Sequence, residues 1–292
     1  MARSGRSRIA ALSVAGVLAG TVVVGCGGDG DTAGPADESR ATKGADDARN
    51  QATEAVRSAY DRTADQETAR VTLRTRTSAE GKSATVRGKG AVDLDDGDSV
   101  LTLTADGGRI EQRVVDQLLY QKPPAGQAPD GKPWIRIDLR KVAAQQRSGD
   151  QSMNDPARSA SLAKAIDDKD VVKSGTATVG GVTTTRYRVR VDVAELPDGA
   201  ALSKRLGPTL PMDLWLDDQG RIRRQQVDMA LKATPRPEAG SSQRSSSAPQ
   251  GVTVRTVLEF SDFGTEVEAD APPASQVTDL TDEAVKQDGA AR

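Results

Sequence analysis

The feature that most constrains this sequence is an alternation of apolar and polar residues with a period of two, which recurs over most of the chain. In residues 70–77, Val71 and Leu73 alternate with arginine and threonine, and in residues 186–193 Tyr187 and three valines alternate with arginine and aspartate. Successive side chains of a strand point to opposite faces, so this period is typical of strands with one buried face. The sequence therefore predicts sheet for most of its length.

Turn residues separate these alternating segments. The run DDGD at 95–98, two glycines at 180–181 and the run DDQG at 217–220 each fall between two segments, and these residue types tolerate the backbone angles of hairpin turns. About ten strands follow with few helices between them, which excludes a doubly wound parallel sheet. We expect one α+β domain, built on a large curved antiparallel β-sheet with helices on one side.

Other segments do not alternate. Helical spacing is found at 46–62, 139–147, 154–166 and 194–206. Residues 232–251 are polar and of low complexity, and they predict a disordered insertion because the alternation resumes directly after them. Residues 282–292 predict a disordered tail.

The N-terminus has the layout of a secretory signal. Three arginines, Arg3, Arg6 and Arg8, precede the uncharged stretch Ile9–Val24. At about 16 residues this stretch is shorter than the roughly 20 that a membrane-spanning helix needs. Its end, VVGC at 23–26, resembles the lipobox of bacterial lipoproteins. The resemblance implies signal cleavage between Gly25 and Cys26.

The same resemblance implies a diacylglyceryl group on the sulfur of Cys26 and palmitate-like acyl chains. Two acyl chains hold a protein durably at a bilayer. We therefore expect a signal peptide at 1–25, a flexible tether at 26–44 and a folded domain at 45–281. The expected location is the extracytoplasmic face of the cell membrane, reached through the lipid anchor.

Several classes of function are excluded by what the sequence lacks. It contains no histidine and one cysteine, which rules out internal disulfides, Ser-His-Asp and Cys-His nucleophiles, and the usual zinc ligand sets. The acidic turn at 93–98 does not fit a calcium loop, because Gly97 stands at position five rather than six. Few aromatic residues and a net charge of −2 argue against a nucleic-acid partner. We expect no enzyme activity, no metal and no cofactor.

Taken together, five features resemble the LolA/LprG/LppX-like envelope lipoproteins of actinobacteria. They are the lipobox at Cys26, the helix before the first strand, WIRIDL at 134–139, PMDLWLDDQGRIRR at 211–224 and EADAPPASQVTDL at 268–280. The resemblance implies a half-barrel sheet with helices on its concave side and an apolar cavity for acyl chains. It implies a protein that binds or shuttles a lipid or lipoglycan in the cell envelope.

Under this interpretation, the inward-facing residues of the strands would line the ligand cavity. The candidates are Val71, Leu73, Val86, Leu101, Leu103, Ile135, Ile137, Val189, Leu214, Leu216, Leu258 and Phe260. The alternative is that the same residues meet helices in a dry core, because any half-buried antiparallel sheet alternates in this way. The sequence leaves both open.

The opposite faces of the strands carry arginines, which are suited to lipid phosphates or to plain solvation. They are Arg70, Arg74, Arg76, Arg186, Arg188, Arg190, Arg221, Arg223 and Arg224. Two functions of another class also remain open. One is a sensor or regulatory lipoprotein that binds an envelope protein such as a signalling receptor or an anti-sigma factor, and the other is a scaffold without a ligand. A membrane transporter would instead be the partner in lipid carriage.

Overall fold

The structure, a computed structural model, describes residues 36–145, 166, 170–196, 199–231 and 251–290. Residues Thr42–Arg292 form one compact unit that contains the whole sheet. Residues Met1–Ala41 form a separate unit, of which only the beginning of helix α1 is described.

The described helices are α1 (Ala36–Ala64), α2 (Leu139–Gln145), α4 (Gly199–Leu206) and α5 (Thr281–Ala290). Short 3₁₀ turns lie at η1 (Pro129–Gly131), η3 (Val193–Glu195) and η4 (Ala274–Gln276). The strands are β1 (Thr68–Ala79), β2 (Lys82–Asp93), β3 (Ser99–Ala105), β4 (Gly108–Val115), β5 (Leu118–Lys122), β6 (Trp134–Asp138), β7 (Val171–Val179), β8 (Val182–Asp192), β9 (Thr209–Leu216), β10 (Ile222–Leu231), β11 (Val252–Ser261) and β12 (Val277–Asp279).

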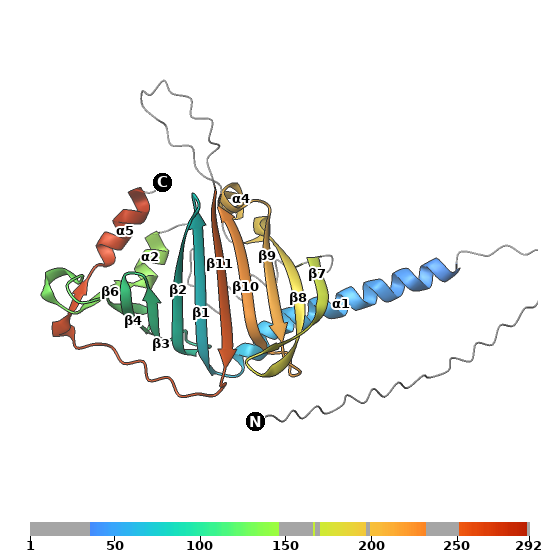
Figure 1. Cartoon of the computed structure of the whole chain (residues 1–292), viewed down its shortest axis with the longest axis horizontal. Helices are drawn as coiled ribbons and strands as arrows, with labels where there is room; N and C mark the ends of the chain where they lie inside the picture. Colours follow the sequence, from blue (N-terminus) through green and yellow to red (C-terminus); the bar gives the residue numbers. More distant parts are fainter. Residues whose placement is uncertain (1–35, 146–165, 167–169, 197–198, 232–250, 291–292) are drawn as a thin grey trace, which may run out of the picture. The chain divides into compact units, whose positions relative to one another are not determined.

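All twelve strands belong to one sheet, in the order β12-β6-β5-β4-β3-β2-β1-β11-β10-β9-β8-β7 (Figure 1). Neighbours are antiparallel except β12, which pairs in parallel with β6. Within the described residues the edge strands β12 and β7 do not pair with each other, so the sheet stays open. The large, mostly antiparallel sheet predicted from the alternation is confirmed.

The predicted turns lie where the sequence placed them. Gly180 and Gly181, both at positive φ, connect β7 to β8, and Gly220, with φ of 77°, closes the turn between β9 and β10. At the acidic turn between β2 and β3, Asp93 accepts hydrogen bonds from the backbone N–H groups of Asp95 and Asp96. This carboxylate therefore stabilises a turn, as its residue type predicts.

Helix α1 covers one face of the sheet over strands β7 to β10. Ala52, Val56, Ala59 and Tyr60 recur at helical spacing, and all four are buried against residues of β7 to β10. Tyr60 Oη lies 3.5 Å from the sulfur of Met212 on β9, and its burial raises the pKa of Tyr60. In Figure 1 the helix passes behind these strands.

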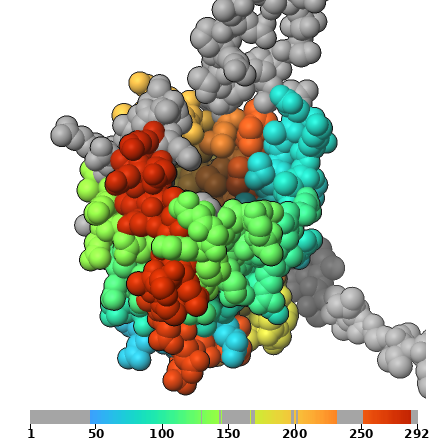
Figure 2. All heavy atoms as spheres, turned by 90° about the vertical axis from the view of Figure 1, so that its left-hand side faces the viewer, coloured from blue at the N-terminus to red at the C-terminus, as the bar shows by residue number. Residues whose placement is uncertain are grey.

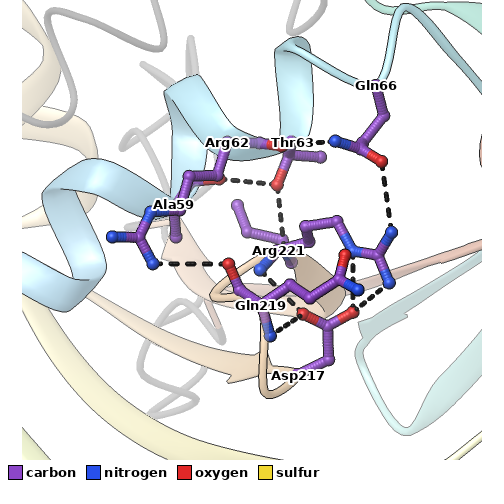
Figure 3. Close-up of polar contacts among 8 residues, drawn as sticks. Ala59, Arg62, Thr63, Gln66, Asp217, Gln219 and Arg221 are labelled. Carbon is purple, nitrogen blue, oxygen red and sulfur yellow. Dashed lines mark hydrogen bonds and ion pairs between the residues drawn. The ribbon is translucent and has the colours of Figure 1, made fainter.

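A hydrogen-bond network joins the end of α1 to the turn between β9 and β10 (Figure 3). Asp217, whose side chain is fully buried, accepts from Nε of Arg221 at 2.9 Å and from the backbone N–H groups of Gln219 and Arg221. Arg221 also donates to Gln66, just after the helix, at 3.1 Å. Because the carboxylate has charged and backbone donors, this network fixes α1 on the sheet.

Thr63 adds a second connection within this network. Its hydroxyl donates to the carbonyl oxygen of Ala59 at 2.6 Å and accepts from the backbone N–H of Ile222 at 2.9 Å. One side chain thus links the last turn of α1 to the first residue of β10, and the sequence gives no signal of this link.

A long segment without regular structure connects β11, in the middle of the sheet, to β12 at its edge (Figure 1). The N–H of Gly264 donates to the carbonyl of Thr68 at 2.9 Å, and Nη1 of Arg113 on β4 donates to the carbonyl of Asp270 at 2.8 Å. This connecting segment, residues 262–276, therefore touches both the central strands and the β4 region.

Two helices extend into segments for which the sequence predicted no regular structure. Helix α1 begins at Ala36, inside the expected tether at 26–44, because residues 36–43 are mainly helix-forming alanine, acid and base. The expected disordered tail at 282–292 is helical as far as Ala290, since α5 begins at the buried Thr281 and carries Asp282 and Glu283 in its first turn. Acidic residues stabilise a helix N-terminus.

The remaining helix predictions are met in part. The helix expected at 139–147 is α2, and the one expected at 194–206 is divided into η3 and α4. The helix expected at 154–166 and the insertion expected at 232–251 lie outside the described residues, apart from Ile166 and Gly251.

Candidate functional site

The strand register places all twelve candidate cavity residues on one face of the sheet. Partners in antiparallel pairs share a face, so Val71 opposite Phe260 and Leu73 opposite Leu258 fix the face at the centre. From there the pairings reach Leu101 and Leu103 on β3, Ile135 and Ile137 on β6, and Val189, Leu214 and Leu216 on β8 and β9. This is the face that α1 covers, and we call it the inner face.

Burial divides the twelve residues into two groups. Val71, Val189, Leu214 and Leu216 are buried, and the last three belong to the core under α1. The other eight are only partly buried: Leu73, Val86, Leu101, Leu103, Ile135, Ile137, Leu258 and Phe260. The dry-core alternative therefore describes the α1-covered half, while the half from β11 to β6 carries partly exposed aliphatic side chains.

The inner face is wider than the sequence indicated. Ile110 and Val114 on β4 and Leu119 on β5 share it by register and are also partly buried. The alternation of Ile110, Gln112 and Val114 was the available signal. It was missed because glutamine at the central position interrupts the apolar pattern.

Two glutamines give this aliphatic surface a polar centre. Nε2 of Gln121 on β5 donates to Oε1 of Gln112 on β4 at 3.2 Å, and both side chains are partly buried. Of the four amide hydrogens in the pair this bond uses one, so one on Gln121, two on Gln112 and carbonyl lone pairs remain for further bonds. A long amphiphile therefore meets both apolar surface and hydrogen-bonding groups on this face.

Gly88 on β2 keeps the aliphatic surface continuous across three strands. A Cβ at this position would lie 2.8 Å from Cδ2 of Leu103 and 3.3 Å from Cβ of Leu73. The two leucines thus approach each other over a strand that contributes no side chain there, and they form one surface from β1 to β3.

The space-filling view from the β4–β6 side shows a recess in the molecule (Figure 2). Its rim is formed by α5, by strands β4 to β6 and by the cyan region of β1 and β2. Orange-brown atoms from the region of β9 and β10 are visible inside it. The partly buried half of the inner face therefore borders a recess.

Helix α5 is attached beside this recess by Asp279 and Thr281. The carboxylate of Asp279 pairs with the guanidinium of Arg136 on β6, and Oγ1 of Thr281 donates to Asp279 at 2.6 Å. The backbone N–H of Asp138 donates to the same hydroxyl at 2.9 Å. Burial acts to raise the pKa of Asp279, but its hydrogen bonds with Thr281 and Arg136 outweigh this and lower it to about 2.

On the outer face, most of the predicted arginines have partners. Arg186 binds Asp213 through two bonds, of 3.2 and 2.8 Å, and Arg224 binds Glu259 at 2.7 Å. Both guanidinium groups lie over the ring of Trp215, at 5.1 and 5.2 Å from its centroid. These arginines cover the only tryptophan of β9 and are structural.

The remaining outer-face arginines differ in their surroundings. Arg221 and Arg223 lie over the ring of Phe263. Arg70, Arg188 and Arg190 have carboxylates at 3.5 to 3.9 Å. Within the described part of the chain, Arg74 and Arg76 have no carboxylate within 4.0 Å.

Two features of the described residues bear on the expectations from the sequence. Among the described residues, no group of three or more acidic or cysteine side chains could hold a metal ion. No helix in the described ranges is both long and apolar enough to cross a membrane. Cys26 lies outside the described residues, so the lipid anchor stays a prediction.

No known protein-family profile matches the chain. One curated relative, an uncharacterised 31.2 kDa protein from the rplA–rplJ intergenic region of Streptomyces griseus, is 28% identical over 177 residues. The match covers 55% of this chain and 52% of the relative, so the chain spans about half the length of the protein it matches.

Solved structures with a similar fold include lipoproteins. LppX of Mycobacterium tuberculosis has 15% identity and a TM-score of 0.46, over 74% of this chain and 99% of that protein. LprF of Mycobacterium bovis has 12% identity and a TM-score of 0.46, over 77% and 98%. MucB in the Pseudomonas aeruginosa MucA/MucB complex has 17% identity and a TM-score of 0.33, over 74% and 61%. These likenesses concern the fold.

Proposed function

We propose that this protein is an extracytoplasmic lipoprotein, anchored through Cys26, that binds the acyl chains of a lipid or lipoglycan on the inner face of its sheet. The observation that carries the proposal is the partly exposed aliphatic surface from β11 to β6. Eight of the twelve candidate residues lie on it, and it borders the recess seen in Figure 2. Contiguous exposed apolar surface of this kind marks binding sites.

The mechanism is an exchange of one apolar environment for another. Burying a methylene group is worth about 0.8 kcal/mol in a bilayer and a similar amount against aliphatic side chains. An acyl chain that moves between them therefore changes its free energy little, and binding is reversible. Gln112 and Gln121 provide hydrogen-bonding groups for the polar part of the ligand.

Helices α2 and α5 contact each other and strand β6, at the edge of this surface, whereas α1 packs on the other half of the sheet. The α1-covered half is a packed core, so Leu214, Leu216 and Val189 hold the fold rather than the ligand. In this proposal the ligand-contacting candidates are the eight partly buried residues, of which Phe260 also packs against the core under α1.

Native mass spectrometry tests the proposal. The protein body from residue 36 onward, purified without detergent, is expected to carry adducts of lipid mass that disappear on denaturation. The variant Leu103→Trp places an indole on the aliphatic surface and is expected to load lipid roughly tenfold less well, a change of about 1.4 kcal/mol.

The matched control is Val172→Trp, on the outer face of β7, where the native side chain is already 52% exposed. This variant adds the same indole away from the inner face and is expected to load normally. A bare mass for the native body after incubation with envelope lipid extract would contradict lipid binding, and it would favour the sensor or regulatory function with a protein partner.

A further inference from the structure

The outer face of the sheet is hollowed at its centre. A groove of about 770 Å³ crosses strands β3, β2, β1, β11 and β10. The residues that line it include Arg74, Arg87, Lys89, Arg224 and Glu259. Of its twelve lining residues, all but Leu73 and Gly88 face away from the aliphatic surface by register, so an acyl chain held on the inner face leaves the groove open.

Three cations in this groove lack a partner. Arg74 on β1 stands directly opposite Arg87 on β2, and Lys89 is the next outward residue along β2. Like charges directly opposite each other destabilise an antiparallel pair. Across the described ranges, no hydrogen bond or carboxylate within 4.0 Å compensates any of the three.

On the neighbouring strands, the positive charges of the arginines are compensated by carboxylates. Arg224 and Glu259 are paired in the same groove, and Arg255 pairs with Asp228 beside it. Among the described residues that line the groove, Glu259 is the only acidic one, and its bond to Arg224 engages it. The net charge of the groove is therefore positive, in a chain whose overall charge is −2.

The chemistry of the lining selects phosphate. A guanidinium group binds two phosphate oxygens at once, and an ammonium group adds a third charged donor. Three threonine hydroxyls, from Thr72, Thr102 and Thr104, also line the groove. No aromatic side chain lines it, which removes the stacking platform that a nucleic-acid strand needs.

We propose that this groove binds the phosphate of an anionic lipid headgroup at the bilayer surface, and thereby fixes which face of the protein lies against the membrane. The inference rests on the proposed anchoring, because the lipid on Cys26 keeps the body within reach of the bilayer. Screening over about 8 Å makes the local charge of the groove decisive over the net charge of the chain.

Site-specific arginine modification tests the proposal on the full chain. The chain is incubated with vesicles of phosphatidylcholine, with or without phosphatidylglycerol, and treated with p-hydroxyphenylglyoxal, and each arginine is quantified by peptide mass spectrometry. Phosphatidylglycerol is expected to slow the modification of Arg74 and Arg87 about tenfold, as for a site that is about 90% occupied. Arg188 and Arg190, equally exposed on the same face, are the internal controls and are expected to react unchanged.

A matched pair of variants sharpens the result. In Arg87→Gln, the protection of Arg74 is expected to fall below about twofold. One of the two opposed guanidinium groups that bind the phosphate is then gone. In Arg188→Gln, which removes the same charge from β8, the tenfold protection of Arg74 is expected to persist.

Three outcomes would overturn the proposal. They are no protection of Arg74 and Arg87, equal protection of Arg188 and Arg190, and full protection by inorganic phosphate with neutral vesicles but none by phosphatidylglycerol. The last would identify a site for free phosphate. The mass of the Cys26 peptide in the same digest reports the anchor, and native mass spectrometry reports lipid loading. Failure of the groove is thus distinguishable from failure of the proposed function.

Discussion

The two halves of the inner face have the same sequence pattern and different surroundings. From β7 to β10, aliphatic residues such as Val189 and Leu214 are fully buried under α1. From β11 to β6, residues such as Leu73 and Leu101 lie on the same face and stay partly exposed. One half holds the fold together, and the other presents apolar surface to a ligand.

The difference shows that alternation defines a face but not what covers it. Leu73 and Val189 each occupy an apolar position between polar neighbours, and nothing in their local sequence separates them. Their fates differ because α1 docks on one half only, through the network around Asp217 and Thr63. A sheet can therefore divide one apolar face into a core and a binding surface by the placement of a single helix.

The largest effect is expected from leucine truncations on the two halves. Leu214→Ala opens a cavity in the packed core and is expected to lower the free energy of unfolding by roughly 4 kcal/mol. Leu101→Ala, on the partly exposed half, is expected to lower it by about 1 kcal/mol, because little additional apolar contact is lost. Urea denaturation of both variants measures the difference. Equal losses would mean that the two halves are packed alike.

A smaller loss of stability is expected when the attachment of α1 to the sheet is weakened. Asp217→Asn removes the charge that compensates the largely buried Arg221, and we expect a loss of roughly 3 kcal/mol. Hydrogen exchange is expected to rise in the last turns of α1. The control is Asp218→Asn, one residue along in the same turn and exposed. Unchanged exchange in α1 would show that the network does not hold the helix.

The smallest effect concerns the edge of the other half and depends on pH. The pKa of Asp279 is lowered in the folded protein, so its contribution to stability is complete above the ordinary value of about 3.9 and is lost as the pH falls towards 2. Hydrogen exchange of β12 and α5 is therefore expected to increase between these values while the α1-covered half stays protected.

The variant Asp279→Asn is expected to remove this pH dependence. A chain in which exchange rises equally in both halves over the same range would contradict a local role for Asp279. Because the carboxylate is partly exposed, the effect is expected at the edge of the sheet and not in global unfolding.

Much of the fold was predictable because it follows local rules. Alternation located most strands, and turn chemistry located the hairpins at Gly180–Gly181 and at Asp217–Gly220. Strand β12 was missed as a parallel partner of β6, since its three residues are too few to show a period. Helix α5 was missed because its start depends on Thr281, which contacts β6 from more than a hundred residues away in sequence.

The sequence predicted which candidate residues share one face of the sheet, but not which of them stay exposed on it. The register places all twelve candidates together, but only burial separates the four buried residues from the eight that stay partly exposed. The same limit applies to the outer face. Arg74 and Arg186 look alike in sequence, and only cross-strand pairing shows that Arg186 has Asp213 while Arg74 faces Arg87.

The order of strands also governs how the chain reaches its native state. Strands β1 to β6 and strands β7 to β11 each form a run of neighbours in sequence, so pairing within each run joins strands that follow one another in the chain. The two runs meet at the pairing of β1 with β11, where Val71 and Phe260 come from sites about 190 residues apart. Because pairing between segments so far apart in sequence is slow to form, we expect this pairing to limit the rate of folding. Until it forms, the edges of β1 and β11 stay available to a second molecule.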